Sequence, residues 1–190
     1  MSRNLTEYDL YDDYSIEKAD WKDFSVYFAV EVFDTIWDGE YEIVPVTKEN
    51  KRDIRKLFVE AFSTIGESQG KTNFEKQNES IESYFDNNPE NTLVNKASTL
   101  IYEKKTNELV GACLISIWEE WPNVYDIAVK PSFQKKGLAK NMLKRSLTIL
   151  KKQYPTLRLF VTLGNDAEMV YRKMGFLAGT ETTEMILPVL

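Results

Sequence analysis

The sequence predicts a protein of the α/β class, α+β type, with a mixed, mostly antiparallel sheet of six or seven strands and about four helices. The hydrophobic period alternates between about 2 and about 3.6 residues, in the order two strands, two helices, three strands, helix, strand, helix, strand. Short four-residue connections separate the three central strands, and such connections join antiparallel neighbours. The 190 residues, 43% of them hydrophobic, are enough to bury one core.

The first part of the chain is set apart by its charge. Residues 1–42 contain twelve acidic and three basic side chains. We therefore place a boundary between an acidic N-terminal extension (1–40) and the domain itself (41–190). The extension can pack on the domain as an added strand, cover a binding cleft or form a homodimer contact, and the sequence leaves these placements open.

The elements follow in order from periodicity and its breakers. An aromatic and β-branched run (24–37) and a second run (41–46) flank Asp38-Gly39, which predicts a β-hairpin, although the first run also suits a helix. A capping box at Thr72 and Glu75 begins the second helix. The later elements are expected at 48–62 (helix), 72–87 (helix), 98–103, 108–118 and 123–129 (strands), between Pro131 and Pro155 (helix), 157–163 (strand), 166–174 (helix) and 176–190 (one or two strands).

Two residue counts exclude whole classes of chemistry. The chain has no histidine, which excludes Ser-His and Cys-His nucleophile pairs, His-ligated metals and an imidazole base. Its one cysteine, Cys113, allows neither an intrachain disulfide nor a thiolate zinc site, so we expect no metal. Because Cys113 lies in an apolar run, we interpret it as a core residue. With no membrane-span or signal pattern, we expect a cytoplasmic protein.

A basic stretch surrounds the most informative motif. Residues 130–158 contain nine basic side chains and no acidic one. Within it a strand runs into a turn at Gly137 and then into a helix, whose first amides and positive dipole end suit phosphate oxygens. Lys135, Lys136 and Lys140 add counter-charge. The chain as a whole is acidic, with a pI near 4.9, and aromatic residues do not interleave the basic ones, so we expect no nucleic-acid partner.

The motif residues resemble the GNAT superfamily of N-acetyltransferases. Gln134-x-x-Gly137-x-Ala139 resembles the family's pyrophosphate loop, and Asn165 followed by Tyr171-x-Lys173-x-Gly175-Phe176 resembles its second motif. Both occur in order inside a matching series of elements over 41–190. The chain is therefore identified as a member of that superfamily, with its substrate subfamily open.

The resemblance implies acetyl-CoA as cofactor and direct acetyl transfer to a primary amine. Tyr171 corresponds to the residue that protonates the leaving thiolate, and it can alternatively be a core residue. Asn165 corresponds to a ligand of the pantetheine arm, and it can also cap a helix. The residues that the resemblance assigns to cofactor binding are Ile127, Ala128, Val129, Gln134, Lys135, Lys136, Gly137, Leu138, Ala139, Lys140 and Asn165.

The general base and the acceptor are less constrained. Asp126 is the first candidate base, since it precedes the predicted acetyl site on its strand, ahead of Glu119 and Glu120. It can alternatively be an ordinary strand carboxylate. Phe160 stands where some peptide N-terminal acetyltransferases have Glu, which argues against that role. The acceptor-binding residues that we predict are Trp118, Glu119, Trp121 and Tyr125. Together with Phe62 they would form an aromatic and partly acidic wall.

Such a wall favours a cationic small molecule or a protein amine as the acceptor. The alternative function is an acyl-CoA-binding regulatory or interaction module of the same fold, without turnover. We expect no membrane partner.

Overall fold

The structure is a computed structural model, which describes residues 17–27, 35–63, 72–162 and 164–186. Its seven strands form one sheet in the order β2-β3-β4-β5-β6-β1-β7. The strands are β1 (Glu17–Tyr27), β2 (Tyr41–Val44), β3 (Thr99–Glu103), β4 (Glu108–Trp118), β5 (Trp121–Val129), β6 (Thr156–Thr162) and β7 (Leu177–Ile186). The helices are α1 (Lys51–Ala61), α2 (Asn73–Asn87), α3 (Leu93–Ala97), α4 (Leu138–Leu150) and α5 (Ala167–Lys173), with two short 3-10 turns.

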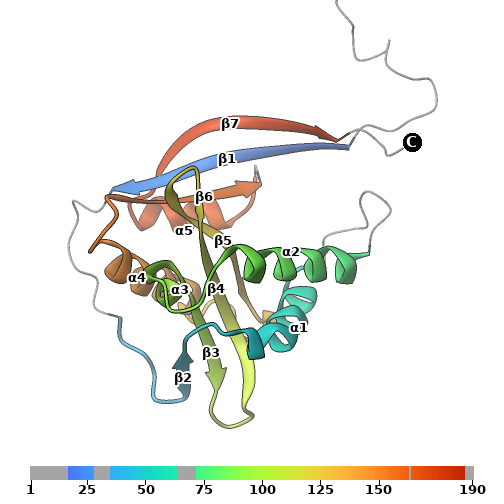
Figure 1. Ribbon diagram of the computed structural model, residues 1–190, viewed down its shortest axis with the longest axis vertical. Helices are drawn as coiled ribbons and strands as arrows, with labels where there is room; N and C mark the ends of the chain where they lie inside the picture. The colour runs from blue at the N-terminus through green and yellow to red at the C-terminus, as the bar shows by residue number, and fades with distance from the viewer. Residues whose placement is uncertain (1–16, 28–34, 64–71, 163, 187–190) are drawn as a thin grey trace, which may run out of the picture.

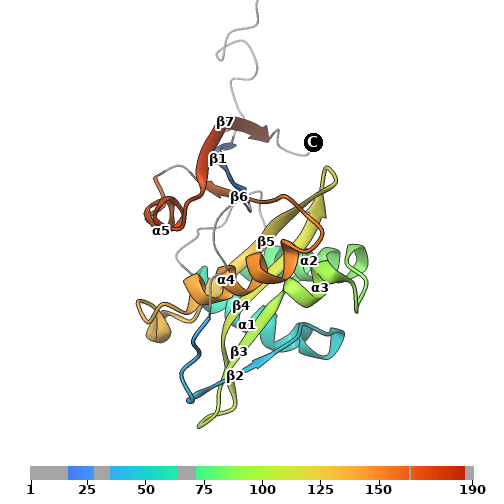
Figure 2. The same ribbon diagram turned by 90° about the vertical axis from the view of Figure 1, so that its left-hand side faces the viewer.

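The mixed, mostly antiparallel sheet confirms the predicted fold class. Among the strand pairs of the described residues, only β5 and β6 run parallel. In Figure 1 the strands β6, β1 and β7 cross the upper part of the molecule, while β2 and β3 lie below them and β4 runs from the lower part up toward β6. Figure 2 shows α5 beside this upper group of strands. The short helix α3, which precedes β3, was missed by the sequence reading.

The hairpin predicted across Asp38-Gly39 is wrong. A turn does form there, with the Tyr41 N–H donating to the Asp38 carbonyl (3.1 Å), and β2 follows it. However, β2 pairs with β3, whereas β1 pairs with β6 on one side and with β7 on the other. The partners of a strand depend on packing with distant segments, which local alternation does not encode. Residues 28–34 of the proposed first arm lie outside the described residues.

The acidic segment therefore supplies a strand to the sheet. Residues 17–27 lie between β6 and β7, which do not pair with each other directly. The boundary near residue 40 and a homodimer contact of the extension stay predictions.

Two apolar clusters occupy the two faces of the sheet. Ile54 and Phe58 of α1 pack with Ile81 of α2 in one cluster, and Met142 and Leu143 of α4 belong to the other. Because successive side chains of a strand point to opposite faces of the sheet, each strand can contribute residues to both clusters. This arrangement leaves α1 and α2 on one side of β5, and α4 and α5 on the other.

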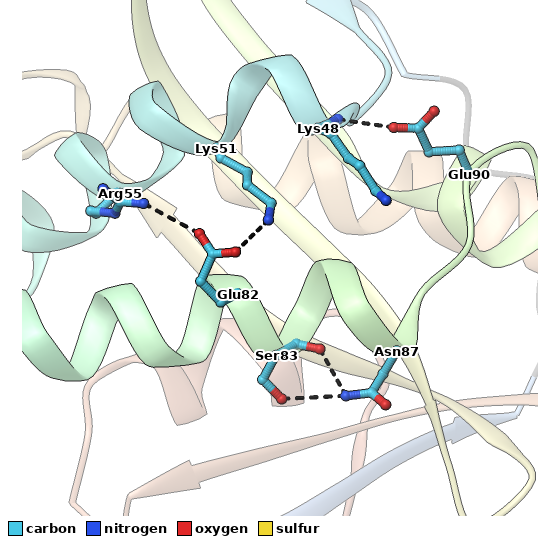
Figure 3. Close-up of polar contacts among 7 residues, drawn as sticks. All are labelled: Lys48, Lys51, Arg55, Glu82, Ser83, Asn87 and Glu90. Carbon is cyan, nitrogen blue, oxygen red and sulfur yellow. Dashed lines mark hydrogen bonds and ion pairs between the residues drawn. The ribbon is translucent and has the colours of Figure 1, made fainter.

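Ion pairs hold α1 against α2. Glu82 of α2 pairs with Lys51 and with Arg55 of α1 (Figure 3), the latter at 3.5 Å. The hydrogen bond from Lys51 lowers the pKa of the Glu82 carboxyl. At the start of the preceding turn, the Lys48 N–H donates to the Glu90 carboxylate at 2.9 Å. These contacts link the two helices that cover one face of the sheet.

Cys113 is a core residue, as predicted. Its side chain is fully buried in the cluster that α4 covers, with its sulfur 4.0 Å from the Ser146 hydroxyl. Burial raises the pKa of the Cys113 thiol to about 12. At neutral pH the sulfur keeps its proton, so it is not an activated nucleophile.

Candidate active site

The parallel strands β5 and β6 separate along their length. They pair only at Asn123 with Arg158 and at Val124 with Leu159. Beyond these pairs, β5 continues to Val129 and β6 turns away toward β1, as Figure 1 shows. The divergence opens the sheet between two adjacent strands, with its vertex at Asn123 and Val124.

A β-bulge in β5 changes which of its side chains face the opening between β5 and β6. Leu114 of β4 stands opposite Asp126 and Ile115 opposite Val124, so Tyr125 is the extra residue. A bulge interrupts the alternation of strand faces, and it therefore lets two consecutive side chains share a face. Tyr125 packs with the cluster under α1 and α2, to which Ala128 also belongs. The alternation of side chains along the strand places Asp126 on the same face as Ala128.

A cavity of about 390 Å³ lies in the opening. Asp126 of β5, Asn165 before α5 and Tyr171 of α5 all line it. Phe62 after α1 and Gln77 of α2 line it as well. Residues whose roles the sequence motifs predict separately thus meet at one site.

A second cavity, of about 370 Å³, lies at the start of α4. It is bounded by α5 and by the loop that carries the Gln-x-x-Gly-x-Ala motif. The predicted cofactor residues that line it are Val129, Gln134, Lys135, Gly137, Leu138, Ala139 and Lys140. Ile127 lines the first cavity instead. Two of the predicted residues line neither: Ala128 is buried under α1 and α2, and the Lys136 ammonium lies over the Phe133 ring at 4.8 Å.

The loop backbone is left-handed at two positions. Lys135 has a φ of 62° and Gly137 a φ of 79°, and α4 begins at the next residue, Leu138. No atom lies within 4 Å of the place where a Cβ would stand at Gly137. Because Gly137 has no side chain, a ligand can approach the free backbone amides at the start of α4, a helix of 13 residues. Such an arrangement suits bound phosphate.

Asp126 has the properties of a proton acceptor near neutral pH. Burial raises the pKa of its carboxyl to about 7, although the hydrogen bond from the Ile127 N–H to its Oδ1 (3.0 Å) works in the opposite direction. A carboxyl group with such a pKa is present in both protonation states at neutral pH. This is the range in which general bases work best.

Tyr171 has the properties of a proton donor. Its side chain is 8% exposed, and its ring lies 5.9 Å from that of Phe176. Burial raises the pKa of its hydroxyl to about 12, to which the charges of Cys113 and Asp126 add. The hydroxyl therefore stays protonated across the whole range in which Asp126 titrates.

Asn165 supports the start of α5 and also lines the first cavity. Its Oδ1 accepts the Ala167 N–H at 2.9 Å, which supports the first turn of α5. The side chain is exposed at the cavity wall. The capping contact occupies one lone pair of the oxygen and leaves the amide N–H groups for other partners.

The predicted acceptor wall is only partly brought together. Tyr125 lines the first cavity, and its hydroxyl donates to the Ser80 carbonyl of α2 at 2.9 Å. Trp118, Glu119 and Trp121 line neither cavity and lie exposed around the β4–β5 turn.

The turn still contacts the cavity wall indirectly. The Trp118 ring packs edge-on against Phe160 at 5.0 Å, and Phe160 lines the cavity. Arg158 lies over the Trp118 ring at 4.9 Å and pairs with Glu119 at 3.3 Å.

Sequence reasoning missed several residues of this cavity, among them Gln77, Asn123 and Phe160. A glutamine on a polar helix and an asparagine in a strand carry no motif, and only the divergence of β5 and β6 shows that they meet.

Neither metal ligands nor a membrane span is found in the described segments. Within 17–27, 35–63, 72–162 and 164–186, no group of three or more Cys, Asp or Glu side chains could hold a metal ion. In the same segments, no helix has the length and apolar character needed to cross a bilayer.

Comparison with known families identifies the class. The acetyltransferase (GNAT) domain family matches residues 65–185. The chain belongs to this family, whose members use acetyl-CoA. No curated protein matches the sequence.

Solved structures share the fold at low sequence identity. A GCN5-related N-acetyltransferase from Sphaerobacter thermophilus has a TM-score of 0.67 and 15% identity, over 92% of this chain and 54% of that one. The ribosomal-protein-S18-alanine N-acetyltransferase from Escherichia coli has a TM-score of 0.56 and 15% identity, over 79% and 95%. A GNAT acetyltransferase from Brucella melitensis, solved with acetyl-CoA, has a TM-score of 0.53 and 16% identity, over 79% and 96%.

The present chain thus spans about half of the length of the Sphaerobacter protein. These likenesses establish the fold.

Proposed function

We propose that the protein transfers an acetyl group from acetyl-CoA to a primary amine. One observation carries the proposal: a carboxyl group with a pKa near 7 and a tyrosine with a pKa near 12 line the same cavity, where β5 and β6 separate. Acetyl transfer to an ammonium needs one group that removes a proton and one that supplies a proton. The two side chains have pKa values suited to these opposite tasks.

The chain's own residues fit acetyl-CoA. The loop from Gln134 to Ala139 and the amides at the start of α4 would hold the phosphates, with Lys135 and Lys140 at the same cavity as counter-charges. The gap between β5 and β6 would receive the pantetheine arm, beside Asn165. When bound, acetyl-CoA supplies an acetyl group activated as a thioester.

Asp126 and Tyr171 divide the proton transfers between them. The Asp126 carboxylate accepts the proton that the acceptor ammonium must lose before its nitrogen can form the new bond to the acetyl carbon. The Tyr171 hydroxyl donates a hydrogen bond, and then a proton, to the sulfur as its bond to that carbon breaks. As the amide forms, its nitrogen loses a second proton, which restores the Tyr171 hydroxyl, and Asp126 releases its proton to water. Protons lost and gained then balance, and no histidine is needed.

The acceptor in this proposal is cationic, as a small molecule or a protein amine. Among the described residues that line the first cavity, none is Lys or Arg, and Asp126 contributes a negative charge when ionised. Phe62, Tyr125 and Phe160 add aromatic faces that suit an alkylammonium. Cytoplasmic location stays a prediction from the sequence.

Release of CoA with a panel of amines tests this function. We expect acetyl-CoA-dependent acetylation of cationic amines, and weak activity with amines that also carry a carboxylate, such as amino acids. Mass spectrometry of the product verifies that acetyl transfer, not hydrolysis, releases the thiol. Tight acetyl-CoA binding without turnover on any amine would favour the regulatory module instead.

Gly137 offers a direct test of the phosphate site. We expect Gly137→Ala to weaken acetyl-CoA binding by about tenfold, because the added methyl group enters the open space over the loop where the phosphates would lie. At this positive φ the methyl group should also lower the stability by about 1–2 kcal/mol. Isothermal calorimetry measures the effect.

Gly175→Ala is the matched control for Gly137→Ala, since Gly175 also has a positive φ (90°) and open surroundings but lies after α5. It should lose similar thermal stability and keep its affinity. Equal loss of affinity in both variants would contradict the phosphate site.

A further inference from the structure

Two amide oxygens at the first cavity have no hydrogen-bond partner. Among the described side chains, the buried polar atoms without a partner are Arg55 Nε, Gln77 Oε1 and Asn123 Oδ1. Gln77 and Asn123 both line the cavity between β5 and β6, whereas Arg55 does not. Buried carbonyl oxygens are nearly always paired in folded proteins, so two exceptions at one cavity call for a common reason.

Asn123 is held in one orientation at the vertex of the opening. Its side chain is 8% exposed, and its Nδ2 donates to the Val124 carbonyl at 3.1 Å. Because that carbonyl can only accept a hydrogen bond, the nitrogen must face it and Oδ1 must be the unpaired atom. The residue therefore offers a hydrogen-bond acceptor at the point where β5 and β6 begin to diverge.

Gln77, on helix α2, offers a second acceptor at the same cavity. It lies on α2, which is fixed to β5 by the bond between the Tyr125 hydroxyl and the Ser80 carbonyl (2.9 Å). The terminal torsion of glutamine is soft, so Oε1 can turn toward a donor in the cavity at little cost. The Asp126 carboxylate adds a further acceptor beside these two amide oxygens, and no cationic side chain lines the cavity among the described residues.

We propose that Gln77 and Asn123 are specificity-determining residues, which bind a second N–H donor group on the acceptor. The favoured class of acceptor is then a small diamine: one amine faces Asp126 and is acetylated, while the other donates to the two amide oxygens. Hydrogen bonds between a charged donor and buried acceptors are among the stronger ones. This inference rests on the proposed function for the identity of the reacting amine.

The experiment compares diaminobutane with butylamine, which has the same chain without the second amine. Calorimetry on the CoA-loaded protein should show at least about tenfold tighter binding of diaminobutane. Equal affinities would overturn the inference. Because the measurement needs no turnover, it succeeds or fails separately from the proposed function, which fails if no amine releases CoA.

Two variants assign the preference to the unpaired oxygens. In Gln77→Met and in Asn123→Leu the diaminobutane preference should fall to about threefold or less, with butylamine affinity unchanged within about twofold. Gln77→Met keeps the shape of the side chain, and since its oxygen has no partner to lose, its melting temperature should not fall.

Gln153→Met, in the turn after α4 and exposed, is the matched control and should keep the full preference. A preference that survives in Gln77→Met would overturn the inference even if Asn123→Leu failed to fold.

Discussion

Tyr171→Phe is expected to lower kcat for acetyl transfer by about 10²- to 10³-fold, with the Kd of acetyl-CoA changed by no more than about twofold. The substitution removes only the hydroxyl, whose proton is retained at neutral pH because burial raises the pKa of Tyr171 to about 12. The ring contact with Phe176 stays in place. Single-turnover kinetics, with calorimetry for binding, separate loss of the proton donor from loss of the cofactor.

Tyr154→Phe serves as the control for Tyr171→Phe. Tyr154 is also partly buried against the cluster that includes Tyr171, but it lies after α4 and lines neither cavity. Its variant should retain full kcat. Unchanged kcat in Tyr171→Phe would mean that another group protonates the sulfur and that Tyr171 is a core residue.

Asp126→Asn is expected to lower kcat/KM by about 10²- to 10³-fold and to change the pH profile. In the wild-type protein, the fraction of Asp126 able to accept a proton rises as pH passes through about 7. The rate should therefore show an inflection near that pH, in addition to the rise that follows ionisation of the amine. Asparagine cannot accept the proton, so the inflection should vanish.

Urea unfolding of the Asp126→Asn variant provides a separate readout. The pKa of Asp126 is raised above its unfolded value of about 3.9. Its stabilising contribution is therefore complete below about pH 4 and is lost as pH rises through about 7. We expect the variant to match the wild type at pH 4 and to exceed it by at least about 1 kcal/mol at pH 8. Lower stability of the variant at pH 8 would show that the charged carboxylate stabilises the fold.

Much of the fold could be predicted because its signals are local. The central strands, the Thr72 capping box and the helix after Gly137 follow from short patterns of side chains, and the structure has them in the predicted order. The partners of β1 could not be predicted in this way. They lie at the other end of the sequence, and the nearby turn at Asp38-Gly39 offered a plausible but incorrect partner.

The site residues, too, could be predicted only where a local signal marks them. The resemblance to the GNAT motif selected Asn165 and Tyr171, and the place of Asp126 on its strand selected a third residue; all three line one cavity. Trp118 and Trp121 were chosen for their aromatic character, but they pair with each other at the β4–β5 turn, outside the opening that begins at Asn123 and Val124. Sequence shows which side chains share a strand, and it does not show where two strands part.

The position of β1 has a consequence for biosynthesis. Val26 pairs with Leu157 and Trp21 with Thr162, so this strand emerges from the ribosome long before the segments that flank it in the sheet. During translation it has to remain unpaired until β6 and β7 have followed, and contacts between such distant segments form slowly. The acidic residues around it would help to keep this unpaired segment soluble, and the part of the sheet beyond β6 would be completed only after β7 has been synthesised.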